Sequence, residues 1–151
     1  MALGAVFVAG IVFRVLVYGQ SLVGDELSTL WIVSHNGPWG TVSFVATDAE
    51  ITPPLFFVLA KLARAFGSAP ELIRLPSTLA GIAMIPVIFG IGRIAIGRRA
   101  ACVAAAIASL SPFLIYFSGN ARAYSVMLLM VAASTLCLLL AARDGQVRAW
   151  A

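Results

Sequence analysis

The stretch at residues 53–66 reads PPLFFVLAKLARAF, and it decides how many times this chain can cross a membrane. The stretch is largely apolar, but a spanning helix needs about 20 consecutive, mainly apolar residues, and this one is shorter. It also carries Lys61 and Arg64, and placing either charge at mid-bilayer costs about 2.5–3.5 kcal/mol. Its length and its charges therefore argue against a span.

Helical spacing gives the same stretch a different place. Four large apolar side chains recur at helical intervals and form one stripe: Leu55, Leu59, Leu62 and Phe66. Lys61 and Arg64 fall on the opposite side, together with Phe57. Thr52 suits an N-cap, and Pro53 suits the first helical position. We therefore expect a short amphipathic helix that lies in the membrane interface with both charges in water.

Composition places the whole chain in a membrane. Its 151 residues are 62% hydrophobic and 11% charged, whereas soluble domains are nearer half apolar and a quarter charged. The Lys and Arg residues are scattered rather than massed, which argues against nucleic-acid binding. We expect an all-α integral membrane protein with about four transmembrane helices, at residues 2–18, 75–92, 100–117 and 123–142.

Basic residues set the expected orientation. With four spans, five arginines share one side of the membrane: Arg93, Arg98, Arg99, Arg143 and Arg148. Basic loops favour the cytoplasm, so we expect that side, and the amino terminus with it, to be cytoplasmic in the plasma membrane. The loop at residues 19–74 and the short turn near 118–122 then lie outside, where we expect the chemistry.

Charged residues near the external ends of the spans are the candidates for that chemistry. Asp25 and Glu26 follow the first span closely, and neighbours face different ways on a helix, so at most one should point into a given site. Otherwise the pair is a solvated loop start or an N-cap for a helix beginning near Leu27. Arg74 and Arg122 border external span ends, where a guanidinium can snorkel to headgroups or grip a phosphate.

Two further features keep two interpretations each. Arg14 lies inside the first apolar run, where it can snorkel outward or pair with a loop carboxylate. Tyr116, Phe117 and Tyr124 bracket the short external turn and can line a lipid groove or form an aromatic belt.

Five motifs occur in a familiar order. They are GDELSTL (24–30), EITPPLFFVLAKL (50–62), RLPSTLAG (74–81), the GRR turn (97–99) and SPFLIYFSGNARAY (111–124). With them the chain resembles the amino-terminal part of the C-type-fold membrane glycosyltransferases, in the branch of the protein mannosyltransferases and lipid A aminoarabinose transferases (glycosyltransferase families 39 and 83). The resemblance implies a single membrane domain over residues 1–151. This domain would be the amino-terminal fragment of a longer multi-span enzyme, with external juxtamembrane amphipathic helices.

The resemblance also implies an activity and its partners. A hexose or pentose would pass from a polyprenyl-phosphate donor to a glycan, lipid or protein acceptor at the external face, among membrane lipids and without nucleic acid. Asp25 matches the family's first-loop acidic position and Glu26 its neighbour, so both are expected catalytic residues.

The expected substrate-binding residues lie around the later motifs: Glu50, Arg74, Asn120, Arg122 and Tyr124. Arg122 and Tyr124 match an Ala-Arg-x-Tyr motif, and Glu50 precedes the Pro-Pro, where relatives place a charged residue. Two positions depart from the family pattern. Asn120 stands where many relatives have a carboxylate, and Thr52 stands where some have a phosphate-binding lysine.

The implied chemistry suits these residue types. A carboxylate such as Asp25 can take the proton of the acceptor hydroxyl, and Arg122 or Arg74 can stabilise the leaving phosphate. A divalent metal ion between Asp25 and the phosphate can share that work, although nothing in the sequence requires a cofactor. Two alternatives stay open: a non-catalytic membrane scaffold or degenerate relative, and, less favoured, a transporter, because the spans carry no acidic relay.

Overall fold

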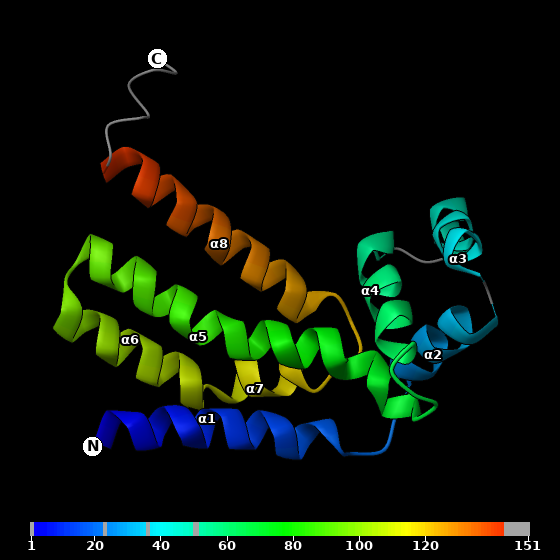
Figure 1. Cartoon of the computed structure of the whole chain (residues 1–151), viewed down its shortest axis with the longest axis horizontal. Coiled ribbons are helices and arrows are strands. Elements are labelled where there is room, and N and C mark those ends of the chain that lie inside the picture. Colours follow the sequence, from blue (N-terminus) through cyan, green and yellow to red (C-terminus); the bar gives the residue numbers. More distant parts are fainter. Residues whose placement is uncertain (1, 23, 36, 50–51, 144–151) are drawn as a thin grey trace.

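The computed structural model describes residues 2–22, 24–35, 37–49 and 52–143, and every regular element among them is helical (Figure 1). In chain order the elements are α1 (Ala2–Tyr18), α2 (Asp25–His35), α3 (Pro38–Phe44), η1 (Val45–Ala49), α4 (Pro54–Arg64), η2 (Pro70–Arg74), α5 (Leu75–Ala95), α6 (Arg98–Leu110), α7 (Pro112–Ser118) and α8 (Tyr124–Arg143).

The helices confirm an all-α membrane protein. Among the described residues, the helix running through η2 and α5 and the helix α8 are each long and apolar enough to cross a bilayer. The α6–α7 pair, bent by 56°, would be a third span, and α1 is apolar but shorter, at 17 residues. The class is as expected, while the full set of four spans stays a prediction.

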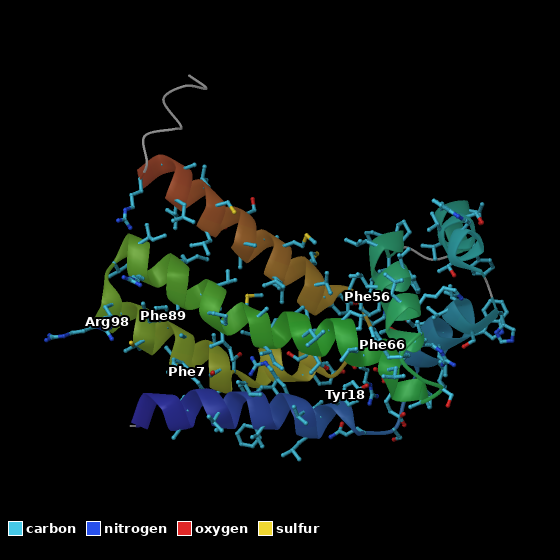
Figure 2. The ribbon with its side chains drawn as sticks, viewed as in Figure 1. Phe7, Tyr18, Phe56, Phe66, Phe89 and Arg98 are labelled. Carbon is cyan, nitrogen blue, oxygen red and sulfur yellow. The ribbon has the colours of Figure 1, made fainter. Side chains whose placement is uncertain are left out.

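The two ends of the helix bundle carry different parts of the chain. Figure 1 shows α5 lying between α8 and α6, with α1 beside α6 and α7. The start of α1, the α5–α6 turn and the end of α8 lie at one end, and α2, α3 and α4 lie at the other. Figure 2 shows Arg98 projecting from the first end and Tyr18 near the second. We call the end that carries α2, α3 and α4 the loop end.

A buried apolar cluster fastens the helices of the loop end to the bundle. It joins α2 and α4 to the starts of α5 and α8 and contains Ile32, Val33, Val45, Phe56, Phe57, Ala60, Ile73, Ala80, Ala121 and Val126. Burial of apolar surface on this scale is the main force that holds short helices in place, because such helices are marginal alone. The chain around the loop end is therefore a packed cap rather than an open loop.

α4 is the expected short helix, but its faces differ from the expectation. Leu62 and Phe66 are exposed, as an interfacial stripe requires, whereas Phe57 is fully buried against the cap and not on a watery side. Lys61 is half-buried, and its ammonium donates to the carbonyl of Val33 at 2.8 Å, so it is not simply in water. The helix has a second apolar face because it covers the bundle end as well as facing outward.

The third apolar run is interrupted, and Arg14 lies at the interruption. α6 ends at Leu110 and α7 begins at Pro112, because proline disfavours a helical residue before it and has no N–H to donate. Arg14 neither snorkels nor meets a carboxylate. Its side chain is fully buried and donates to backbone carbonyls of α1 and α6.

Glycine allows α1 and α6 to approach at this level. A Cβ placed on Gly10 would lie 2.7 Å from the carbonyl oxygen of Ser109, which is closer than real Cβ atoms come to backbone. At Gly4, on the same helix, a Cβ would meet nothing within 4 Å. The contact between the helices therefore depends on Gly10.

We expect Gly10→Ala to destabilise the fold by about 1–3 kcal/mol, the usual cost of overpacking. Gly4→Ala is the matched control and should be neutral or stabilising by up to about 1 kcal/mol, because alanine is the better helix former. Thermal unfolding in detergent micelles, followed by circular dichroism, measures both. Equal melting temperatures for the two variants would contradict the close approach.

Candidate functional site

Asp25 and Glu26 begin α2 and point in different directions. Gly24 precedes them with φ of +51°, a left-handed conformation that glycine adopts without strain and that turns the chain into the helix. Two acids in a first helical turn also interact favourably with the helix dipole. Consecutive residues are about 100° apart around a helix axis. As a result, the side chain of Asp25 is 77% exposed and that of Glu26 is 5% exposed.

Glu26 forms a buried, two-point ion pair with Arg74. Nε of Arg74 donates to Oε1 at 2.8 Å, and Nη2 donates to Oε2 at 2.5 Å. The same Nη2 donates to the carbonyl of Ser21, and Nη1 donates to the carbonyls of Tyr18 and Gln20. A guanidinium has five N–H donors, and these five hydrogen bonds match that number.

This saturation disfavours the expected contact between Arg74 and a phosphate, which stays a prediction. An anion would have to displace Glu26 or the carbonyls that follow α1, and breaking a buried ion pair leaves an uncompensated charge. Arg74 and Glu26 therefore hold the cavity wall together, and the catalytic role expected of Glu26 stays a prediction. Nothing in the sequence indicated that Glu26 and Arg74 would form an ion pair.

Glu26 also holds the turn between α7 and α8, together with two hydroxyl side chains. The backbone N–H of Ala121 donates to Oε1 of Glu26 at 2.8 Å, and the hydroxyl of Thr29 donates to the carbonyl of Ala121 at 3.1 Å. From α5, Ser77 donates to the carbonyl of Arg122 at 3.1 Å. Hydrogen bonds from two helices therefore fix the backbone on either side of Arg122.

Asp25 faces Arg122 as a result. Oδ2 of Asp25 lies 3.5 Å from Nη2 of Arg122, and the Arg122 side chain is 17% exposed. The distance is longer than that of a tight charge-assisted hydrogen bond, and the carboxylate is largely open to solvent. The exposed carboxylate of Asp25 can accept a proton, and the mostly covered guanidinium of Arg122 beside it can hold an anion.

These two residues line a cavity of about 630 Å³ at the loop end. It brings together six of the seven expected site residues: Asp25, Glu26, Arg74, Asn120, Arg122 and Tyr124. The seventh, Glu50, lies outside the described residues. The remaining lining comes from Val17, Gln20, Ser21, Gly24, Tyr116, Phe117 and Gly119.

An aromatic wall forms one side of the cavity. The ring of Phe117 lies 5.3 Å from that of Tyr116 and 4.9 Å from that of Tyr124, both in edge-on or tilted arrangements. Tyr116 and Tyr124 are exposed, at 61% and 46%. The sequence indicated aromatic residues around this turn, but the α6–α7 break that aims Tyr116 and Phe117 at the cavity depends on three-dimensional packing.

The described residues offer no ready metal site. No group of three or more His, Cys, Asp and Glu side chains that could hold an ion occurs among them. Of the two acids in the cavity wall, Glu26 is committed to Arg74 and Asp25 faces Arg122. Among the described residues, these side chains do not make up a site for a resident divalent ion.

Comparison with known proteins points to one family. A family model described as dolichyl-phosphate-mannose-protein mannosyltransferase matches residues 51–151. No curated protein and no solved structure matches the chain. The matched part contains Arg74, Arg122 and Tyr124, whereas Asp25 and Glu26 precede it. The contacts described above are what join the two parts at one cavity.

The buried pair gives a prediction about stability. Glu26→Gln keeps an acceptor for Ala121 but leaves the charge of Arg74 unpaired, and we expect a loss of about 3–5 kcal/mol in the free energy of unfolding. Glu71→Gln is the control, because Glu71 is a nearby acid that lines no part of the cavity. Chemical denaturation in micelles measures both, and similar small losses would show that the pair is not structural.

Proposed function

The chain belongs to the dolichyl-phosphate-mannose-protein mannosyltransferase family, and we propose that it transfers a sugar from a polyprenyl-phosphate donor to an acceptor hydroxyl in the cavity beside Asp25 and Arg122. The single observation that carries this proposal is the pairing of an exposed carboxylate with a mostly covered guanidinium in a cavity at the end of an apolar bundle. A donor with a charged head and a long apolar tail matches that position.

Asp25 is the proposed general base. The acceptor oxygen must lose its proton as it forms a bond to the anomeric carbon of the sugar, and the Asp25 carboxylate takes that proton. The bond from the anomeric carbon to the phosphate oxygen breaks in the same step, so attack from the opposite face inverts the anomeric centre. The exposure of Asp25 supports this role, because an acceptor can reach it.

Arg122 is the proposed partner of the leaving phosphate. Negative charge grows on the lipid phosphate as the glycosidic bond breaks, and a guanidinium already in place stabilises that charge without reorganising. Hydrogen bonds to the backbone on both sides of Arg122 support this role, because they fix where the side chain begins. Tyr124 and Asn120 border the same space and would contact the sugar or the phosphate.

The aromatic wall suits both the polar head and the apolar tail of such a donor. Tyr116 also lines a second groove, which runs along α1 and the junction of α6 and α7. Aromatic rings with polar tips favour the level where lipid headgroups meet water. The wall would hold the sugar near Asp25 while the isoprenoid chain stays among lipid tails.

The proposal includes an orientation. We propose that the loop end faces outward across the plasma membrane and that the amino terminus is cytoplasmic. Arg93, Arg98 and Arg99 at the opposite end support this, because short basic loops favour the cytoplasmic side. The acceptor, a glycan, a lipid or a protein, would then be met at the external face.

We expect Asp25→Asn to reduce donor turnover by at least about 100-fold, within the range that general bases contribute, while the protein stays folded. Release of polyprenyl phosphate from labelled polyprenyl-phosphate hexoses and pentoses, added to cell membranes that contain the acceptor, measures turnover before the acceptor is identified. Glu71→Gln serves as the control and should turn over donor at the parental rate. Turnover by Asp25→Asn at the parental rate would refute the proposed site.

Cysteine accessibility tests the orientation. In a chain with Cys102 and Cys137 replaced by alanine, Trp39→Cys should react with an impermeant maleimide added to intact cells, because Trp39 is 86% exposed at the loop end. Arg98→Cys, at the other end, should react only after the membrane is permeabilised. The reverse pattern would place the cavity in the cytoplasm.

A further inference from the structure

Arg14 is a buried charge that the proposed reaction does not use. It is the one charged residue of α1, and its side chain is fully buried. A buried charge without partners is costly in any protein interior, and more so in a helix that faces lipid.

The partners of Arg14 are backbone carbonyls. Nη1 donates to the carbonyls of Gly10 and Ser109, each at 2.8 Å, and Nη2 donates to the carbonyl of Ala108 at 3.0 Å. Gly10 belongs to the same helix as Arg14, and the other two belong to the last turn of α6. One guanidinium therefore connects the middle of α1 to the end of α6.

Pro112 explains why those carbonyls of α6 need a partner. In an unbroken helix the carbonyl of Ala108 would accept from the N–H of residue 112, but proline has none. Ser111 is extended, with φ of −61° and ψ of 117°, so the last carbonyls of α6 lack intrahelical donors. Within a bilayer such groups must be satisfied inside the protein, and the carbonyl end of a helix attracts a cation.

α7 begins directly after the junction that Arg14 binds. The chain bends by 56° between α6 and α7, and α7 carries Tyr116 and Phe117 into the cavity wall. α5 also packs against the junction. A Cβ on Gly81 would clash with the hydroxyl of Ser118 and would lie 3.3 Å from Nε of Arg14. Four helices therefore meet around one side chain.

We propose that Arg14 is a positioning residue of the site: it binds the carbonyls that the Pro112 break leaves without donors, and so holds α7 and its aromatic wall against α1 and α5. The effect of Arg14 on turnover rests on the proposed function. Its effect on the position of α7 does not.

The first experiment measures the position of α7 directly. In the cysteine-free background, spin labels at Val8 on α1 and Phe113 on α7, both exposed, report the distance between the helices by double electron–electron resonance. We expect Arg14→Met to shift or broaden that distance. Arg98→Met, which removes an exposed arginine from α6 itself, is the control and should leave it unchanged. An unchanged distance in Arg14→Met would overturn the proposal.

The second experiment tests the link to Pro112. An alanine at position 112 restores an N–H that can bond to the carbonyl of Ala108, so Arg14 has less to do there. We expect Arg14→Met to lower the melting temperature less than half as much in the Pro112→Ala background as in the parent. Equal losses in both backgrounds would overturn the proposal. If Arg14→Met alone fails to fold, recovery of a folded protein in the double variant supports the link, and failure of both contradicts it.

Donor turnover completes the test. A misplacement of the aromatic wall by about 1 Å can cost roughly 100-fold, so we expect a loss of that order for Arg14→Met and a smaller one for Arg14→Lys, which keeps the charge. Arg98→Met should keep parental turnover. If the parent itself releases no polyprenyl phosphate from any donor, the proposed function fails, while the spin-label distance and the Pro112 link still decide the role of Arg14.

Discussion

The ion pair between Glu26 and Arg74 is the constraint on which the candidate site depends. Arg74 ends η2 directly before the long helix α5, Glu26 lies in the first turn of α2, and the same carboxylate accepts the N–H of Ala121 in the turn before α8. The other charged contact between the start of α2 and that turn, Asp25 with Arg122, is longer and more exposed, at 3.5 Å. Because Glu26 faces inward, the helix turns Asp25 outward, and because Ala121 is held, Arg122 stands opposite Asp25. The chemistry at the surface is thus set by a pair that is itself buried.

The different positions of the neighbours Asp25 and Glu26 explain what the sequence could and could not predict about the site. The acidic pair near a span end, the arginines and the aromatic turn were all recognisable, and helix geometry indicated that only one acid would face a given site. Which acid faces outward was not recognisable, because Asp25 and Glu26 differ by one methylene and occupy the same helical turn. The answer comes from Arg74, 48 residues away from Glu26. Arg74 and Arg122 posed the same problem, since both border span ends that are expected on the same side of the membrane and only packing distinguishes them.

The cap at the loop end shows a second limit. A stripe of leucines with charges opposite predicts an amphipathic helix, and α4 is one, but periodicity describes only the face turned to solvent or lipid. It does not reveal that a helix will also cover another part of the protein. Phe57 is buried and Lys61 reaches the end of α2 because α4 has a covering role as well as an interfacial one. Local pattern gave the element, and long-range packing gave its surroundings.

The distribution of the basic residues predicts the orientation of the chain. Some of these residues also bind the carboxyl ends of helices. Three of them bind carbonyls at the carboxyl ends of helices. Arg74 binds a carbonyl at the end of α1, Lys61 binds one in the last turn of α2, and Arg14 binds one in the last turn of α6. Each such end has carbonyls without intrahelical donors and carries partial negative charge, and water is scarce around an apolar bundle. A cation at each end satisfies both needs. Arg122 is placed differently, beside the carboxylate of Asp25 in the cavity, which is why we propose it as the cation that meets the substrate phosphate.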